Sequence, residues 1–129
     1  METVDGTLTH PFTLIAAGGT GSGKTRWVRT LLERGRECID PPPERVYWYY
    51  SEFQLDYQAL QQVLPHIEFI KGLPSEEEIQ QLDKNLRNVV VIDDLMSELS
   101  QVVTNLFTRG SHHRNISVVL LVQNLFFKY

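Results

Sequence analysis

The chain has 129 residues, and we expect residues 1–129 to form a single domain. Its 42% of apolar and 22% of charged residues exclude an intrinsically disordered chain, and its net charge of -4 argues against a strongly basic nucleic-acid-binding protein. The single cysteine, Cys38, excludes an internal disulfide. Residues 1–10 have neither the basic nor the apolar region of a signal peptide, and no apolar run reaches the roughly 20 residues of a membrane span, so we expect a protein that is neither secreted nor membrane-spanning.

The first half of the chain alternates between strand and helix patterns. The apolar run FTLIAA, residues 12–17, predicts a buried strand that ends at glycines. Apolar side chains then recur at helical spacing from Trp27 to Leu32, and they predict a helix over about 23–35. After the turn-forming PPPE, the patterns predict, in chain order, a strand at 45–51, a helix at 53–64 and a short strand at 66–72.

The second half continues the alternation. Ser75 and Glu78 have capping-box spacing and predict the start of a helix over 74–86. The later patterns predict, in chain order, a strand at 88–95, an amphipathic helix at 97–110 and a strand at 116–124. Because apolar strands alternate with helices, we expect an α/β fold, a three-layer sandwich around a mainly parallel sheet.

The octapeptide GGTGSGKT follows the first strand and matches the phosphate-binding pattern G-x-x-x-x-G-K-[ST]. Glycines let successive backbone N–H groups surround a phosphate, and the following helix directs its positive end at the same anion. We expect Lys24 to contact the β- and γ-phosphates and Thr25 to supply a hydroxyl to Mg²⁺. The expected nucleotide-binding residues are Gly18, Gly19, Thr20, Gly21, Ser22, Gly23, Lys24 and Thr25.

Polar side chains are expected to meet at the carboxyl edge of the sheet, where such folds bind ligands. The run VVVIDD delivers Asp93 and Asp94 there; we expect Asp93 to hold Mg²⁺ through water and Asp94 to orient or deprotonate the attacking water. Gln123 ends the last strand and is expected to contact the γ-phosphate or that water. Arg114 precedes this strand and is expected to reach a nucleotide in a neighbouring subunit. The alternatives are a solvated carboxylate for Asp94, a solvent-facing amide for Gln123 and a surface cation for Arg114.

The stretches FTLIAAGGTGSGKTRWVRTLL, VVVIDDLM and LFTRGSHHRNISVVLLVQNLF resemble viral genome-packaging ATPases of the poxvirus-like and Maverick/Polinton type, within the FtsK–HerA superfamily of P-loop motors. The resemblance covers most of the chain, from about Pro11 to Phe127. It implies a P-loop NTPase core of the additional-strand-catalytic-E type, with strand order 5-1-4-3-2. It also implies ATP and Mg²⁺ as cofactors, and a homo-oligomeric ring that pumps double-stranded DNA into a capsid.

Site roles follow from the resemblance. It assigns Lys24 and Thr25 to the nucleotide and Mg²⁺, Asp93 to Mg²⁺, Asp94 to the catalytic acid position, Gln123 to a sensor at the end of the fourth strand, and Arg114 to an arginine finger. Capsid or portal components are the implied partners besides DNA, and the virion or the infected host cell is the implied location.

The sequence departs from this family in two places. Asp94 stands where most of the superfamily carries glutamate, and the chain ends at Tyr129, directly after the fourth core strand. We therefore expect a C-terminally truncated core that lacks the fifth strand. Two alternatives stay open, namely a small-molecule or nucleoside kinase and a non-catalytic nucleotide-binding interaction module.

Overall fold

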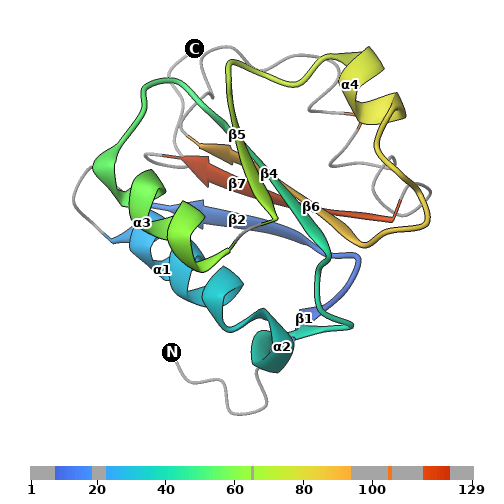
Figure 1. Ribbon diagram of the computed structural model, residues 1–129, viewed down its shortest axis with the longest axis horizontal. Helices are drawn as coiled ribbons and strands as arrows, with labels where there is room; N and C mark the ends of the chain where they lie inside the picture. Colours follow the sequence, from blue (N-terminus) through green and yellow to red (C-terminus); the bar gives the residue numbers. More distant parts are fainter. Residues whose placement is uncertain (1–7, 19–22, 65, 94–104, 106–114, 123–129) are drawn as a thin grey trace.

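The computed structural model describes residues 8–18, 23–64, 66–93, 105 and 115–122 of the chain. In this part, five strands form one parallel sheet with the order β2-β7-β6-β4-β5 (Figure 1). They are β2 (Thr13–Ala17), β4 (Arg45–Tyr50), β5 (Ile67–Lys71), β6 (Asn88–Asp93) and β7 (Ile116–Val122). The prediction of an α/β fold around a mainly parallel sheet is confirmed.

The order of the strands in the sheet differs from their order in the chain. The strands predicted at 12–17, 45–51, 88–95 and 116–124, taken as first to fourth, lie in the order 1-4-3-2. The short strand predicted at 66–72 is present as β5, and it pairs with β4 at one edge of the sheet. Since β2 forms the opposite edge, no strand among the described residues lies on its outer side.

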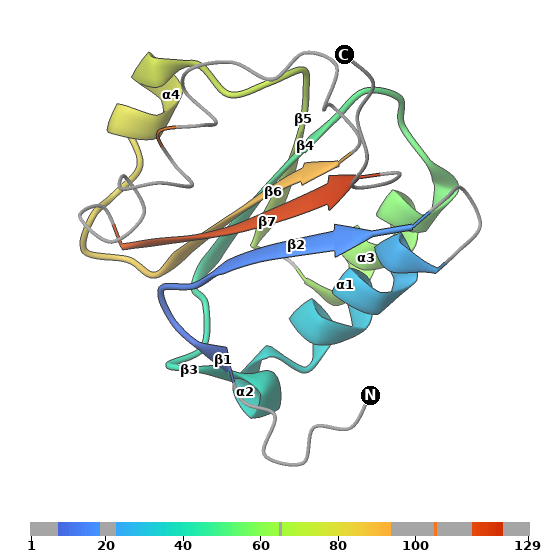
Figure 2. The ribbon, with the colours of Figure 1, turned by 180° about the vertical axis from the view of Figure 1, so that it is seen from behind.

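Described helices pack on both faces of the sheet (Figures 1 and 2). The helices α1 (Lys24–Glu33) and α3 (Leu55–Val63) cover one face, where Val28 and Leu60 join an apolar core with Trp48. The short helix α4 (Glu76–Gln80) packs Ile79 into a second core on the opposite face. The arrangement agrees with the predicted sandwich of helix, sheet and helix layers.

The two central strands, β6 and β7, are buried at every residue. They are apolar on both faces because helices or loops cover both sides of a central parallel strand. Burying one Val, Leu or Ile side chain stabilises a fold by about 1.5–3 kcal/mol, so these strands contribute heavily to the core. The backbone of Asp93, the last residue of β6, is therefore part of this buried sheet.

The helix predicted over 74–86 is shorter than expected. Its start is confirmed, because the Ser75 hydroxyl accepts a hydrogen bond from the Glu78 N–H and the Glu78 carboxylate accepts one from the Ser75 N–H. The helix ends at Gln80, however. Further along, the Asp83 carboxylate accepts a hydrogen bond from the Asn85 N–H at 2.9 Å. This local turn competes with helical hydrogen bonding, and the prediction for the second half of the segment was wrong.

Three short elements were not predicted. Helix α1 ends at Glu33, and Gly35, predicted as its end, begins the short helix α2 (Gly35–Cys38). Strands β1 (Leu8–Thr9) and β3 (Ile39–Asp40) form a separate two-stranded parallel sheet. Two residues are too few to show a hydrophobic period, so the sequence carries no signal for these strands. The helix predicted at 97–110 lies outside the described residues except for Asn105.

Candidate functional site

The connection from β2 to α1 begins and ends at described glycines. The Gly18 N–H donates to the Val122 carbonyl at 3.1 Å, which extends the pairing of β2 and β7 beyond Ala17. Gly23 precedes the first residue of α1 and has a φ of 90°, a left-handed conformation that a side chain at this position would strain. The backbone conformation therefore favours glycine at position 23, where the phosphate-binding pattern also has one.

Lys24 and Thr25 form the start of α1, beside the edge strand. A cavity of about 480 Å³ lies there, lined by β2 from Leu14 to Ala17 and by Gly23, Lys24 and Trp27. Lys24 and Thr25 are both half-buried. The first N–H groups of a helix have no partner within the helix, so the start of α1 provides hydrogen-bond donors beside this cavity.

Asp93 lies at the same edge of the sheet as the end of β2. In the register, Asp93 is opposite Leu121 of β7, and Leu121 is opposite Ala16 of β2. Two strand spacings separate the backbones of Asp93 and Ala16 by roughly 10 Å. Alternation along β6 puts Asp93 on the same face as Val91, which belongs to the core beneath α1 and α3. The fold therefore brings Asp93 to the sheet face and the sheet edge on which α1 begins.

Asp93 is only 3% exposed, and among the described residues two side chains donate hydrogen bonds to its carboxylate. Its Oδ2 accepts a hydrogen bond from the Tyr57 hydroxyl at 2.6 Å and one from the Trp48 indole N–H at 3.3 Å. Both donors stabilise the charged carboxylate, which would otherwise be costly to bury. Neither Tyr57 nor Trp48 was among the site residues predicted from the sequence. The sequence offers only a general signal for them, because the hydroxyl of a buried tyrosine or the indole N–H of a buried tryptophan usually has a hydrogen-bond partner.

The donor set suits Mg²⁺. A carboxylate from Asp93 and a hydroxyl from Thr25 are the hard oxygen ligands that this ion prefers. Among the described residues, no group of three or more His, Cys, Asp or Glu side chains is arranged to hold a metal by itself.

The remaining predicted site residues lie outside the described part of the chain. They are Gly19, Thr20, Gly21, Ser22, Asp94, Arg114 and Gln123. Their roles stay predictions from the sequence.

A larger cavity, of about 980 Å³, lies at the opposite end of the sheet, between α1, α2 and the start of β4. Arginines and glutamates line it together, and several of them pair with each other. The Nε of Arg34 forms an ion pair with Oε1 of Glu37 at 2.8 Å, and Nη1 of Arg87 lies 3.6 Å from Oε1 of Glu44. Because these charges compensate one another, and because the phosphate-binding pattern is at the other end, we place the candidate site at the smaller cavity.

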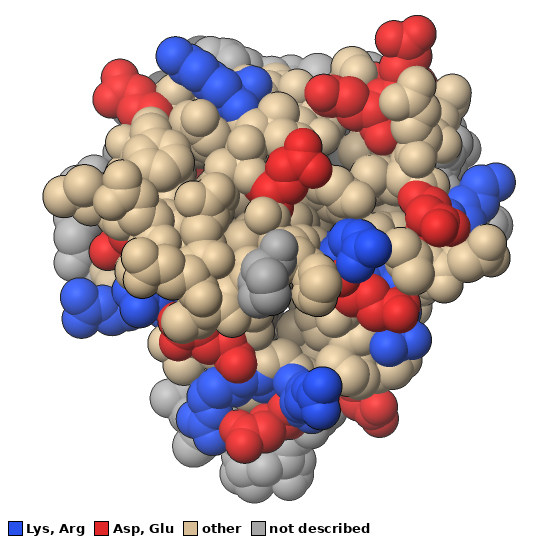
Figure 3. Space-filling view, in the orientation of Figure 1, with Lys and Arg blue, Asp and Glu red and all other residues tan. Residues whose placement is uncertain are grey.

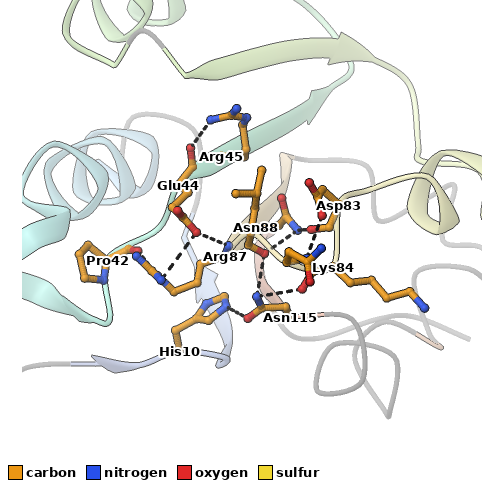
Figure 4. Close-up of polar contacts among 11 residues, drawn as sticks. His10, Pro42, Glu44, Arg45, Asp83, Lys84, Arg87, Asn88 and Asn115 are labelled. Atoms are coloured by element: carbon orange, nitrogen blue, oxygen red, sulfur yellow. Dashed lines mark hydrogen bonds and ion pairs between the residues drawn. The ribbon is translucent and has the colours of Figure 1, made fainter.

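A polar network joins the strand starts near this second cavity (Figure 4). His10 is buried; its Nδ1 lies 2.6 Å from the Ser117 hydroxyl and its Nε2 lies 2.8 Å from the Asn115 side-chain oxygen. The Ser117 oxygen also accepts the Phe12 N–H at 3.0 Å. A neutral imidazole protonated at Nε2 satisfies all of these partners, since Ser117 then donates to Nδ1. The network ties β1, β2 and β7 together and has a structural role.

This network predicts an acid-sensitive fold. Burial lowers the pKa of His10 from its usual 6.5, and nearby Arg87 acts in the same direction, against the Asn115 hydrogen bonds and Glu44. The unfolded chain therefore binds this proton more readily than the folded chain does. The contribution of His10 to the free energy of unfolding is fully present above pH 6.5 and is lost as the pH is lowered below that value. Urea unfolding at pH 7.5 and 5.5 measures the loss. His10→Gln should lose less stability between the two pH values than the wild type, and an equal loss would contradict the assignment.

Among the described helices, none is long and apolar enough to cross a membrane. No protein-family model matches this chain, and no curated protein is significantly similar to it.

Proposed function

We propose that this chain is the ATP-binding and ATP-hydrolysing core of a viral DNA-packaging motor, with a P-loop NTPase fold. The observation that carries the proposal is the strand order. Strand β7 lies between β2, which leads into the phosphate-binding pattern, and β6, which ends in Asp93. The order 1-4-3-2 of these core strands agrees with part of the order 5-1-4-3-2 of the packaging ATPases that the sequence resembles. The sheet differs from that order in two ways: among the described residues no strand lies beyond β2, and β5 adds a strand beyond β4.

The local geometry adds support. The start of α1, the left-handed Gly23 and the cavity beside Lys24 suit a bound phosphate chain. In this proposal, backbone N–H groups of residues 19–25 surround the phosphates, and Lys24 neutralises their charge. Asp93 and Thr25 hold Mg²⁺, which when bound supplies charge stabilisation to the phosphates.

In this proposal, hydrolysis depends on three residues that flank β6 and β7 in the sequence: Asp94, Arg114 and Gln123. Asp94 orients the attacking water and accepts its proton, although its side chain is one methylene shorter than the usual glutamate. Gln123 contacts the γ-phosphate or the water. Arg114 acts in a neighbouring subunit, where a finger of this kind stabilises the transition state of phosphoryl transfer. This last role requires the proposed homo-oligomeric ring.

Double-stranded DNA and capsid or portal components are the proposed partners, in the virion or in the infected cell. On the face shown in Figure 3, acidic and basic side chains are interspersed. This face of the described residues therefore offers no extended basic surface of the kind that binds DNA backbones. We accordingly place DNA binding in the assembled ring or in further sequence, and not on this face of the single chain.

Following the fate of the γ-phosphate tests the proposed reaction. With γ-labelled ATP, Mg²⁺ and a mixture of nucleoside and sugar acceptors, we expect the label to appear as free phosphate. Double-stranded DNA should raise the rate. Label that accumulates on an acceptor faster than free phosphate would identify a kinase instead. ATP that binds but is not consumed, with or without DNA, would identify a non-catalytic nucleotide-binding module.

A further inference from the structure

The larger cavity is built from four separate segments of the chain. They are the end of α1 together with α2, the loop that leads into β4, the connection between α3 and β5, and the residue before β6. Its volume of about 980 Å³ is at the upper end of the range for sites that bind small organic molecules. Pro42, Pro43 and Leu64 contribute apolar walls. Sites of this kind select a ligand through a few polar groups, so the charged side chains decide which ligand fits.

Ion pairs balance only some of the charges around this cavity. Four arginines and three glutamates line it. Each glutamate has an arginine partner, and the partner of Glu33 is Arg29, which does not belong to the lining. Two of the lining arginines, Arg36 and Arg45, pair with no carboxylate in the described part of the chain. The cavity therefore has an excess of positive charge, which an anionic ligand would balance.

Two of these arginines, Arg45 and Arg87, are held in place by the loop before β4 (Figure 4). Nε of Arg87 donates to the Pro42 carbonyl, and Nη1 of Arg45 donates to the Glu44 carbonyl at 3.0 Å. Both residues are half-buried. A guanidinium has five N–H donors, so most of the donors of each side chain remain for a ligand. Guanidinium groups anchored in this way lose little freedom on binding, and their planar fork matches phosphate oxygens.

Glu44 weakens this positive charge without removing it. Its Oε1 accepts the backbone N–H of Arg87 at 2.9 Å. The separation of 3.6 Å between the same oxygen and Nη1 of Arg87 is too long for a hydrogen bond. A carboxylate this close to the guanidinium lowers its attraction for a second anion. Glu44 is therefore expected to oppose anion binding at this cavity, whereas Arg45 and Arg87 favour it.

We propose that this cavity is a second binding site, for a small organic molecule that carries a phosphate group. The remaining donors of Arg45 and Arg87 hold the phosphate, and the exposed Arg36 adds attraction from α2. The proline and leucine walls contact the rest of the molecule. The phosphate-binding pattern lies at the opposite end of the sheet, so both sites can be occupied together. This inference goes beyond the proposed ATPase function and does not depend on it.

A phosphate titration followed by NMR of the backbone amides tests the site, because each amide reports on its own surroundings. Inorganic phosphate and phenyl phosphate are the probes, and sodium chloride of equal ionic strength is the control. We expect both probes to shift the amides of Gly35, Arg45 and Arg87 to saturation, and phenyl phosphate to bind more tightly because its ring contacts the apolar walls. Arg45→Gln should weaken binding at these amides about 10-fold, whereas Lys24→Ala should leave it unchanged.

Glu44→Gln is the matched variant with the opposite expected sign. It removes the negative charge and keeps an oxygen that can accept the Arg87 N–H. Binding of both probes should become tighter, a gain that damage to the fold would not produce. Equal shifts with sodium chloride, or unchanged phosphate binding in both Arg45→Gln and Glu44→Gln, would overturn the second site. Phenyl phosphate that binds no more tightly than inorganic phosphate would overturn the assignment of an organic ligand.

Discussion

Asp94→Asn is expected to bind Mg²⁺-ATP with wild-type affinity and to release phosphate about 10²- to 10⁴-fold more slowly. The reason is that a carboxylate at this position is proposed to act on the attacking water and not on the nucleotide, and general-base catalysis contributes about this factor. Calorimetric titration measures the affinity, and steady-state phosphate release measures the rate. The test requires a form of the protein that turns over ATP.

Asp94→Glu is the informative partner of that variant. It restores the side-chain length that most of the superfamily has, so we expect it to keep or raise the rate of phosphate release. If Asp94→Asn releases phosphate as fast as the wild type, Asp94 is a solvated carboxylate with no part in the reaction.

Asp93→Asn should behave differently from Asp94→Asn. It replaces the buried charge that Tyr57 and Trp48 hold, and it removes the proposed ligand of Mg²⁺. Nucleotide binding and turnover should therefore fall together, in contrast to the separate loss of turnover expected for Asp94→Asn.

Much of the sheet could be predicted from the sequence because its strands are short apolar runs. β6 and β7 are buried at every position, and continuous burial leaves a continuous apolar pattern. The predicted strand at 66–72 was confirmed as β5. By contrast, the early end of α4 depends on a side-chain turn at Asp83, which competes with helix formation and leaves the helical period unchanged.

The candidate site was predictable only in part. Local sequence patterns predicted Lys24 and Asp93 as site residues. Lys24 belongs to the pattern G-x-x-x-x-G-K-[ST], and Asp93 directly follows the apolar run VVVI. The anchoring of Asp93 by Tyr57 joins residues 36 positions apart. It depends on how α3 packs on the sheet, which no local period describes. The sheet face on which Asp93 lies likewise depends on which side of β6 the helices α1 and α3 cover.

The most direct test of the central claim is the affinity of the chain for Mg²⁺-ATP with and without the Lys24 side chain. Lys24 begins α1 and lines the cavity beside β2. A hydrogen bond to a charged group is worth about 1.5–3 kcal/mol, so Lys24→Ala should weaken binding roughly 10- to 150-fold in a calorimetric titration. Arg26→Ala, two residues further along α1 and exposed, is the control and should bind as the wild type does. Wild-type affinity in Lys24→Ala, or no binding of ATP by the wild-type chain, would contradict the account.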